Sequence, residues 1–201
     1  KFRSTLFVRD TFANLDGHSL AVEDGYDSNN SLYAFQTGLE FNDLITQNHL
    51  TFHTHKHDRE YNSPNDEFDD YESDSYVVKA EHSTQKTDKF SYGLGFEYKY
   101  DDAFFDNKGS YNSSLSADYD NIGLYGNVGY EFTDSLSSTL NLRTDNNSTV
   151  GSNDSYKIGI LKENIFPNLN FKLSHSIGFK NPSLYELHGA DNYGYTGNNN
   201  L

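Results

Sequence analysis

The stretch of sequence that decides the fold runs from Leu169 to Leu201 and reads LNFKLSHSIGFKNPSLYELHGADNYGYTGNNNL. In its first half, large apolar side chains alternate with polar or small ones, which is the pattern of a strand with one apolar face. The apolar positions are Leu169, Phe171, Leu173, Ile177 and Phe179. Pro182 cannot donate a ladder hydrogen bond and restricts the residue before it, so we expect the strand to end at Asn181.

The same alternation recurs along the chain and predicts nine strands, at 4–15, 31–42, 49–62, 76–83, 90–100, 118–132, 136–145, 156–160 and 169–180. Their connections alternate between short turns and long polar loops, the loops being expected at 16–30, 63–73, 101–116 and 146–153. Bacterial outer-membrane barrels connect their strands in this way. The pattern predicts an all-β, antiparallel up-and-down transmembrane β-barrel. Because an open sheet edge in lipid leaves backbone groups without partners, we expect the nine strands to be part of a larger barrel.

The composition is typical of a barrel wall. Only 34% of the residues are hydrophobic and the mean hydropathy is −0.80, yet 15% are aromatic, which argues against disorder. A polar interior, polar loops and a thin apolar band with aromatic girdles give such an average. The net charge of −15 argues against a nucleic-acid partner, since phosphate binding requires basic patches.

Several classes of protein lack their sequence signatures here. The chain has no cysteine, which excludes disulfides, zinc–thiolate sites and thiol catalysis. It has no Gly-x-Ser-x-Gly elbow, phosphate-binding loop or HExxH motif, so we do not expect an enzyme. No apolar run reaches the roughly 18 residues of a transmembrane helix. No signal peptide precedes the strand-like pattern that begins at Lys1, and for an outer-membrane protein this leads us to expect an internal segment.

Residues 178–189 read GFKNPSLYELHG, and Tyr193-Gly194 and Gly197-Asn198 follow. This order of residues resembles the barrel of TonB-dependent outer-membrane receptors, of the cobalamin and siderophore type, in which such a strand leads into a loop ending in Gly-Asn-x-x-Leu. Residues 135–145, SLSSTLNLRTD, resemble the family's strands that end in Arg-x-Asp. The resemblance implies a barrel of about 22 strands around a plug domain. We therefore expect residues 1–201 to be part of one β-barrel domain, with the plug and the remaining strands outside this sequence.

The resemblance also implies a function and a location. A receptor of this family lies in the bacterial outer membrane, in contact with its lipid, and takes up a scarce nutrient such as a siderophore–iron complex, cobalamin or a haem or metal chelate. Uptake is driven by the inner-membrane TonB energy-coupling complex, which acts on the plug. Two alternatives remain open from the residues alone. One is a passive porin or an adhesive barrel, and the other is a soluble secreted β-protein that binds glycans, in which the face formed by 90–100 would pack against another sheet.

Four histidines share one face of the strand predicted at 49–62: His49, His53, His55 and His57. The opposite face carries Leu50 and Phe52, so the histidines are expected to face the barrel interior. Neighbours two residues apart on a strand lie about 6.5–7 Å apart, close enough for two imidazoles to reach one metal ion or a haem edge. The alternative is a polar wall that happens to use histidine.

Six acidic residues fall between 66 and 74 in the predicted loop 63–73 and just after it, and they include Asp66, Asp69 and Asp70. Clustered carboxylates are ligands for Ca²⁺, and the resemblance to cobalamin receptors implies loops ordered by that ion. The EF-hand spacing is absent, so a solvated acidic loop is the alternative. No other cofactor is expected.

The predicted loops are rich in tyrosine, which offers apolar area and a hydrogen-bonding tip for gripping an amphipathic nutrient. The candidates for ligand binding are Tyr71, Tyr111, Tyr185, Tyr193 and Tyr195.

Overall fold

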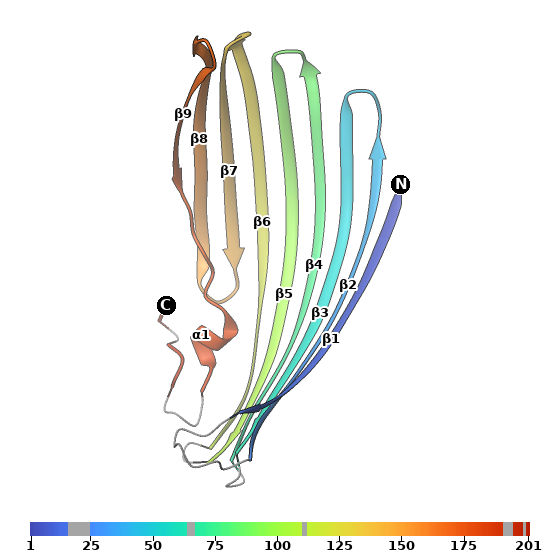
Figure 1. Cartoon of the computed structure of the whole chain (residues 1–201), viewed down its shortest axis with the longest axis vertical. Helices are drawn as coiled ribbons and strands as arrows, with labels where there is room; N and C mark the ends of the chain where they lie inside the picture. The colour runs from blue at the N-terminus through green and yellow to red at the C-terminus, as the bar shows by residue number, and fades with distance from the viewer. Residues whose placement is uncertain (16–24, 64–66, 110–111, 191–194, 199) are drawn as a thin grey trace.

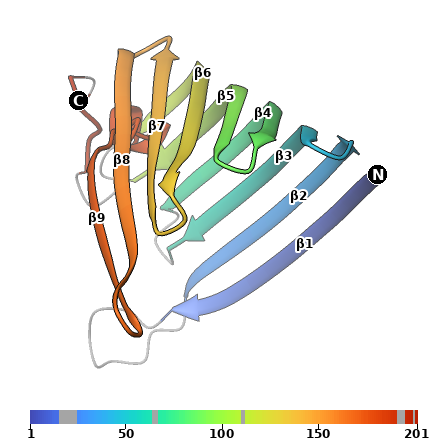
Figure 2. The same cartoon turned by 90° about the horizontal axis from the view of Figure 1, so that it is seen from above.

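Nine antiparallel strands form one sheet in which each strand pairs with its neighbours in sequence (Figure 1). The computed structural model of the chain describes residues 1–15, 25–63, 67–109, 112–190, 195–198 and 200–201. The strands are β1 (Phe2–Leu15), β2 (Tyr26–Asn42), β3 (Thr46–Asn62), β4 (Phe68–Thr87), β5 (Phe90–Lys108), β6 (Ser113–Thr133), β7 (Leu136–Asn147), β8 (Gly151–Phe166) and β9 (Leu169–Ile177), followed by the short helix α1 (Leu184–His188). Figure 2 shows the sheet as a curved wall with separate edges at β1 and β9. This up-and-down arrangement confirms the predicted partial β-barrel.

The outward face of the wall is apolar and uncovered. Phe96, Leu124 and Leu173, on β5, β6 and β9, leave 38%, 53% and 59% of their surface exposed. A continuous apolar surface is unfavourable in water and suited to lipid. The soluble alternative required a second sheet against residues 90–100. In the part of the chain that the structure describes there is only one sheet, so no second sheet packs against residues 90–100 there.

Among the described residues, no helix is both long enough and apolar enough to cross a membrane.

The apolar side chains of the outward face form a band, called the apolar band below, that runs obliquely across the strands. One row of directly paired residues, perpendicular to the strands, shows this: Leu39, Leu50, Ala80, Phe96, Leu124, Thr144 and Asp154, from β2 to β8. The row is apolar as far as β6 and polar on β7 and β8. An oblique band is what strands tilted against the bilayer normal require, because the hydrocarbon boundary then cuts each strand at a different residue.

The strands continue far beyond this band. β4, β5 and β6 contain 20, 19 and 21 residues, whereas a tilted strand crosses the hydrocarbon with about 9–11. The excess lies at the end where the N-terminal strand β1 finishes, which we call the loop end; the opposite end, with the short connections at 43–45, 88–89, 134–135 and 167–168, is the turn end (Figure 1).

The predicted long loops are therefore largely strand. β2 already begins at Tyr26, β4 at Phe68 and β8 at Gly151, while β5 continues to Lys108 and β6 begins at Ser113. Beyond the bilayer both faces of a strand contact water, so the alternation that identifies a strand disappears while the backbone ladder persists. The acidic stretch predicted as a loop at 63–73 belongs mostly to β4 for this reason.

An acidic belt lies on the outward face next to the apolar band, toward the loop end. Direct cross-strand pairs join carboxylates, for example Glu60 to Asp70 and Asp70 to Asp106. Burial and then the neighbouring carboxylates, led by Glu72, raise the pKa of Asp70. Lys56 offsets part of the repulsion through an ion pair with Glu72 at 3.2 Å. The belt consists of Asp58, Glu60, Asp70, Glu72, Asp74, Asp102, Asp106 and Asp118.

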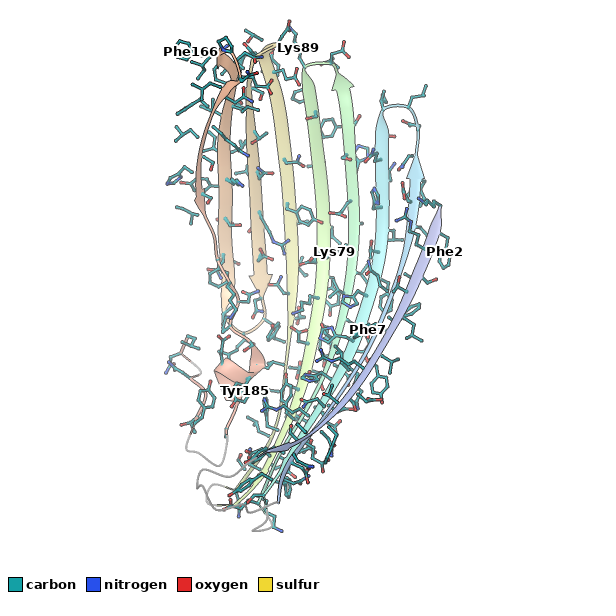
Figure 3. The ribbon with its side chains drawn as sticks, viewed as in Figure 1. Phe2, Phe7, Lys79, Lys89, Phe166 and Tyr185 are labelled. Atoms are coloured by element: carbon teal, nitrogen blue, oxygen red, sulfur yellow. The ribbon has the colours of Figure 1, made fainter. Side chains whose placement is uncertain are left out.

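The inward face carries a network of opposite charges at the level of the apolar band. Arg143 on β7 donates to Glu97 on β5 at 2.8 Å and to Asp145 at 2.6 Å, and Lys79 on β4, labelled in Figure 3, pairs with Glu97 as well. The Tyr125 ring lies flat against the wall because position 95 is glycine; a Cβ there would lie 2.2 Å from the ring. Polar side chains facing the interior at bilayer depth thus satisfy one another.

We expect Phe96→Arg to lower the free energy of unfolding by about 2–4 kcal/mol, because it places a charge in the hydrocarbon. Asp102→Arg, on the same strand and face but in the acidic belt, should change it by no more than about 0.5 kcal/mol. Denaturant unfolding of the full-length protein in lipid vesicles measures both. Equal losses for the two variants would contradict the placement of the band.

Candidate ligand-binding site

After β9 the chain leaves the sheet and turns onto its inward face. β9 ends at Ile177, four residues before Asn181, where the strand was predicted to end. Asn181 donates from Nδ2 to Oδ1 of Asn121 on β6 at 3.0 Å, although these residues are 60 positions apart. α1 then contacts β5 and β6 (Figure 1). The polar segment that follows the strand is thus part of the inner wall.

A capping box starts α1. The Ser183 hydroxyl accepts from the Glu186 backbone N–H at 3.2 Å, and the Ser183 N–H donates to Glu186 Oε2 at 2.7 Å. The Ser183 backbone N–H, followed by the side chains of Lys180 and Ser183, lowers the pKa of Glu186 to about 2. No helix is predicted here from the strand pattern. The Ser-x-x-Glu motif just after a proline is the signal that would have identified it.

Two leucines hold α1 against the wall. Leu184 and Leu187 are 5% and 1% exposed, and Leu184 packs in a cluster with Ala103, Phe105 and Tyr119 of β5 and β6. Burying a leucine side chain stabilises a structure by roughly 1.5–3 kcal/mol. The docking of α1 therefore depends on apolar contact between the helix and the inward face near the loop end.

The segment after α1 folds back over the helix. The Gly197 N–H donates to the Gly189 carbonyl at 2.7 Å, and the Asn198 N–H donates to the Glu186 carbonyl at 2.9 Å. A Cβ at position 197 would lie 2.5 Å from the backbone of Leu187 and His188, so this close approach requires glycine. Part of the motif that carried the family resemblance, Gly197-Asn198, thus closes the segment onto α1.

A series of aromatic rings connects β3 to this segment. His57 contacts Tyr71 on β4 with ring centroids 6.0 Å apart, and Tyr71 contacts Tyr185 on α1 at 6.4 Å. Tyr195 stacks on Tyr185 at 4.9 Å with the ring planes 2° from parallel. All three separations are in the range of favourable aromatic pairs. Figure 3 labels Tyr185 on α1, at the side of the wall toward the loop end.

A cavity of about 430 Å³ lies between these rings and the inward face of β3–β5. It combines aromatic walls with one cation, Arg59, which forms no ion pair with any described residue. Asp69 at its edge accepts from Asn107 Nδ2 at 2.6 Å. The cavity is lined by His57, Arg59, Tyr61, Asp69, Asp70, Tyr71, Phe105, Asn107, Ser183, Tyr185 and Ala190. This arrangement can hold a flat or amphipathic molecule that carries an anionic group.

The structure brings together residues that the sequence analysis proposed for separate roles. The cavity collects Tyr71 and Tyr185 from the ligand set and His57 and Asp69 from the metal set, whereas Asp70 borders it from the strand but belongs to the outward-facing row. Tyr71 lies in strand β4 rather than in a loop. Tyr195 joins the site through its stacking on Tyr185. The predictions for Asp66, Tyr111 and Tyr193 lie outside the described residues.

The histidines face inward, as predicted, but they lie at different positions along β3 between the turn end and the loop end. The rings of His53 and His55 are 5.6 Å apart, whereas His49 pairs with Glu40 and Glu81 toward the turn end. Among the residues described, no three His, Cys, Asp or Glu side chains are grouped to hold one metal ion. Strand alternation also separates Asp69, which faces inward, from Asp70. The proposed metal and Ca²⁺ sites remain predictions.

Arg59, Tyr61 and Phe105 line the cavity. Arg59 and Tyr61 were not singled out from the sequence, and Phe105 was noted only as one of the aromatic residues of the predicted loops. Arg59 and Tyr61 continue the series of alternate residues on β3 that contains the histidines. Extending the inward-facing row beyond His57 would therefore have identified both. Phe105 was predicted to lie in a loop, and only the continuation of β5 to Lys108 shows that it lies on the inward face of the sheet.

The sequence matches the model of a family described as TonB dependent receptor-like, beta-barrel, over residues 2–201. The fold is similar to that in a solved structure described as the RagAB peptide importer in the "open-open" state, with 13% sequence identity and a TM-score of 0.46. The match covers 75% of this chain, and the chain spans only 22% of that importer chain. No curated protein matches the sequence.

The capping box makes α1 sensitive to acid. The pKa of Glu186 in the folded protein, about 2, is below its ordinary value of 4.5, so ionised Glu186 stabilises α1 above pH 4.5 and this contribution is lost as the pH falls toward 2. Amide-exchange protection factors at 183–187, corrected for the intrinsic rate, should fall across this range. Glu186→Gln should show low protection at neutral pH and no such transition. An unchanged pH profile in that variant would contradict the assignment.

Proposed function

The chain belongs to the TonB-dependent receptor-like β-barrel family, and we propose that it forms the part of a nutrient importer's barrel wall that contacts the incoming ligand. Membership of this family places the protein in the bacterial outer membrane. In bacterial barrels the short turns face the periplasm and the longer connections face the outside. The loop end, with the cavity, therefore faces the medium from which nutrients arrive.

The observation that carries the proposal is the position of the cavity. It lies on the inward face, above the apolar band, where a molecule entering from outside meets the barrel interior. Its walls come from three strands and from the segment that turns inward after β9. Ligand pockets commonly combine aromatic walls with a few polar groups that fix orientation, as this one does.

For the whole protein, the proposal includes a plug domain and an energy-coupling partner in addition to the wall formed by this chain. A plug domain would close a barrel of about 22 strands, and the inner-membrane TonB complex would drive release of the bound nutrient through that plug. The chemistry of the wall is then recognition and gating, without a covalent step. The charge network around Glu97 and Arg143 would line the path below the cavity.

The cargo class is proposed from the chemistry of the cavity. Aromatic faces suit the flat, apolar parts of a chelate, and Arg59 suits a carboxylate or another anionic group. The histidine row at His53, His55 and His57 runs from the cavity toward the turn end, and neutral imidazole binds many transition metals. A metal chelate with an anionic group, such as a siderophore–iron complex, haem or a corrinoid, fits these features best.

We expect Tyr71→Ala and Tyr185→Ala each to weaken ligand binding by the full-length receptor about tenfold, which corresponds to about 1.4 kcal/mol, because each removes a wall of the cavity. The control is Tyr98→Ala, a tyrosine of the outward face of β5. Equilibrium binding would be measured with a ferric catecholate, a ferric hydroxamate, cyanocobalamin and haemin, on receptors that retain heat-modifiable migration. If the best of these probes binds both cavity variants as tightly as the control, the site is elsewhere.

A further inference from the structure

Two imidazoles on the inward face of β3, those of His53 and His55, form no hydrogen bond with any described residue. Next to them, the hydroxyl of Ser75 on β4 is buried and has no partner in this part of the chain either, in a residue that is only 2% exposed. We propose that these three side chains bind one divalent transition-metal ion, and that Zn²⁺ fits them best. None of the three lines the nutrient cavity, so the site does not depend on the nutrient.

The separation of the two imidazole rings fits one bridging ion. A bond from zinc to a histidine nitrogen is about 2.0–2.1 Å long, which places the ion about 3.2 Å from the centre of each ring that it binds. Two rings on one ion can therefore have their centres at most about 6.4 Å apart. The observed separation of 5.6 Å corresponds to an angle of about 120° at the ion. Tetrahedral Zn²⁺ accepts such an angle more readily than a square-planar ion, whose ligands lie about 90° or 180° apart.

The strand register places Ser75 where it can complete the site. Ser75 is directly opposite His55 and diagonal to His53 across the β3–β4 pair. Directly paired Cβ atoms lie about 4.5–5.5 Å apart and diagonal neighbours about 7–8 Å apart, so an ion held by both rings is within reach of the hydroxyl. On its other side Ser75 is directly paired with Asp101 of β5. A hydroxyl whose oxygen binds an ion needs an acceptor for its proton, and the Asp101 carboxylate provides one.

A polar wall without an ion does not account for these groups. Buried polar side chains are nearly always hydrogen-bonded, and an unpaired one requires an explanation such as a bound ion or water. The charged groups on neighbouring inward positions are already paired, Lys99 with Asp101 and Glu97 with Arg143. The groups left over are neutral imidazoles and a hydroxyl rather than carboxylates. This donor set selects a nitrogen-binding ion such as Zn²⁺ over Ca²⁺, which prefers oxygen ligands.

Isothermal titration of Zn²⁺ into the full-length receptor, freed of metal with a chelator and kept in detergent, measures the site. His53→Ala and His55→Ala should each weaken one Zn²⁺ site at least about tenfold, since even groups outside the ligand set change metal affinity by about 10–100-fold. His49→Ala is the matched control, an inward histidine of the same strand, and should leave that site unchanged. Ser75→Ala should weaken the site without lowering the midpoint of denaturant unfolding, because it removes an unpaired buried hydroxyl.

X-ray absorption at the zinc edge, with one equivalent of Zn²⁺, should show two imidazole ligands in the unaltered receptor and one in either variant of the pair. Excess Ca²⁺ should leave the Zn²⁺ bound; if it displaces the ion, the ion lies on the acidic belt and the assignment is wrong. Equal Zn²⁺ affinity in His53→Ala, His55→Ala and His49→Ala would also overturn it. Tyr185→Ala, which removes a wall of the nutrient cavity, should not change Zn²⁺ binding, so this result is independent of where the nutrient binds.

Discussion

Backbone hydrogen bonding in hydrocarbon is the constraint on which the rest of this structure depends. Within a bilayer no water can satisfy an exposed N–H or C=O, so each strand must pair along its full length with neighbours. The continuous ladder from β1 to β9 meets this requirement, and it leaves the side chains free to alternate. One row faces lipid, and the other faces the interior, where Glu97, Arg143 and Asp145 satisfy one another.

The same ladder extends beyond the bilayer and thereby builds the candidate site. Backbone pairing holds β3, β4 and β5 in register past the apolar band, which places His57, Arg59 and Tyr71 side by side on a rigid wall. The segment after β9 then returns to this wall through two buried leucines of α1. A site formed on strands is better fixed than one formed on free loops, and only its inner side depends on the folded-back segment.

The sequence was informative where the environment differs between the two faces of a strand. Within the bilayer the period-two alternation predicted the number, order and facing of the strands. Beyond it, both faces are wet, so residues such as Asp70 and Phe105 carried no pattern and were assigned to loops. Tyr71 and Tyr185 were proposed from the sequence for one role, but their meeting in one cavity depends on a fold-back that no local pattern encodes. The oblique course of the apolar band follows from the register between strands, which no single strand pattern encodes.

The central claim is that the strands continue, paired and alternating, from the bilayer into the medium. The chain contains no cysteine, so single cysteines can be introduced along β5 from 90 to 108 and spin-labelled in vesicles, provided the rest of the protein is also free of cysteine. Oxygen accessibility should peak at even positions up to about residue 100, and even positions from 102 onward should be accessible to a water-soluble nickel relaxant, with low mobility throughout. High, uniform mobility after residue 100, without a period of two, would show a loop there and contradict the account.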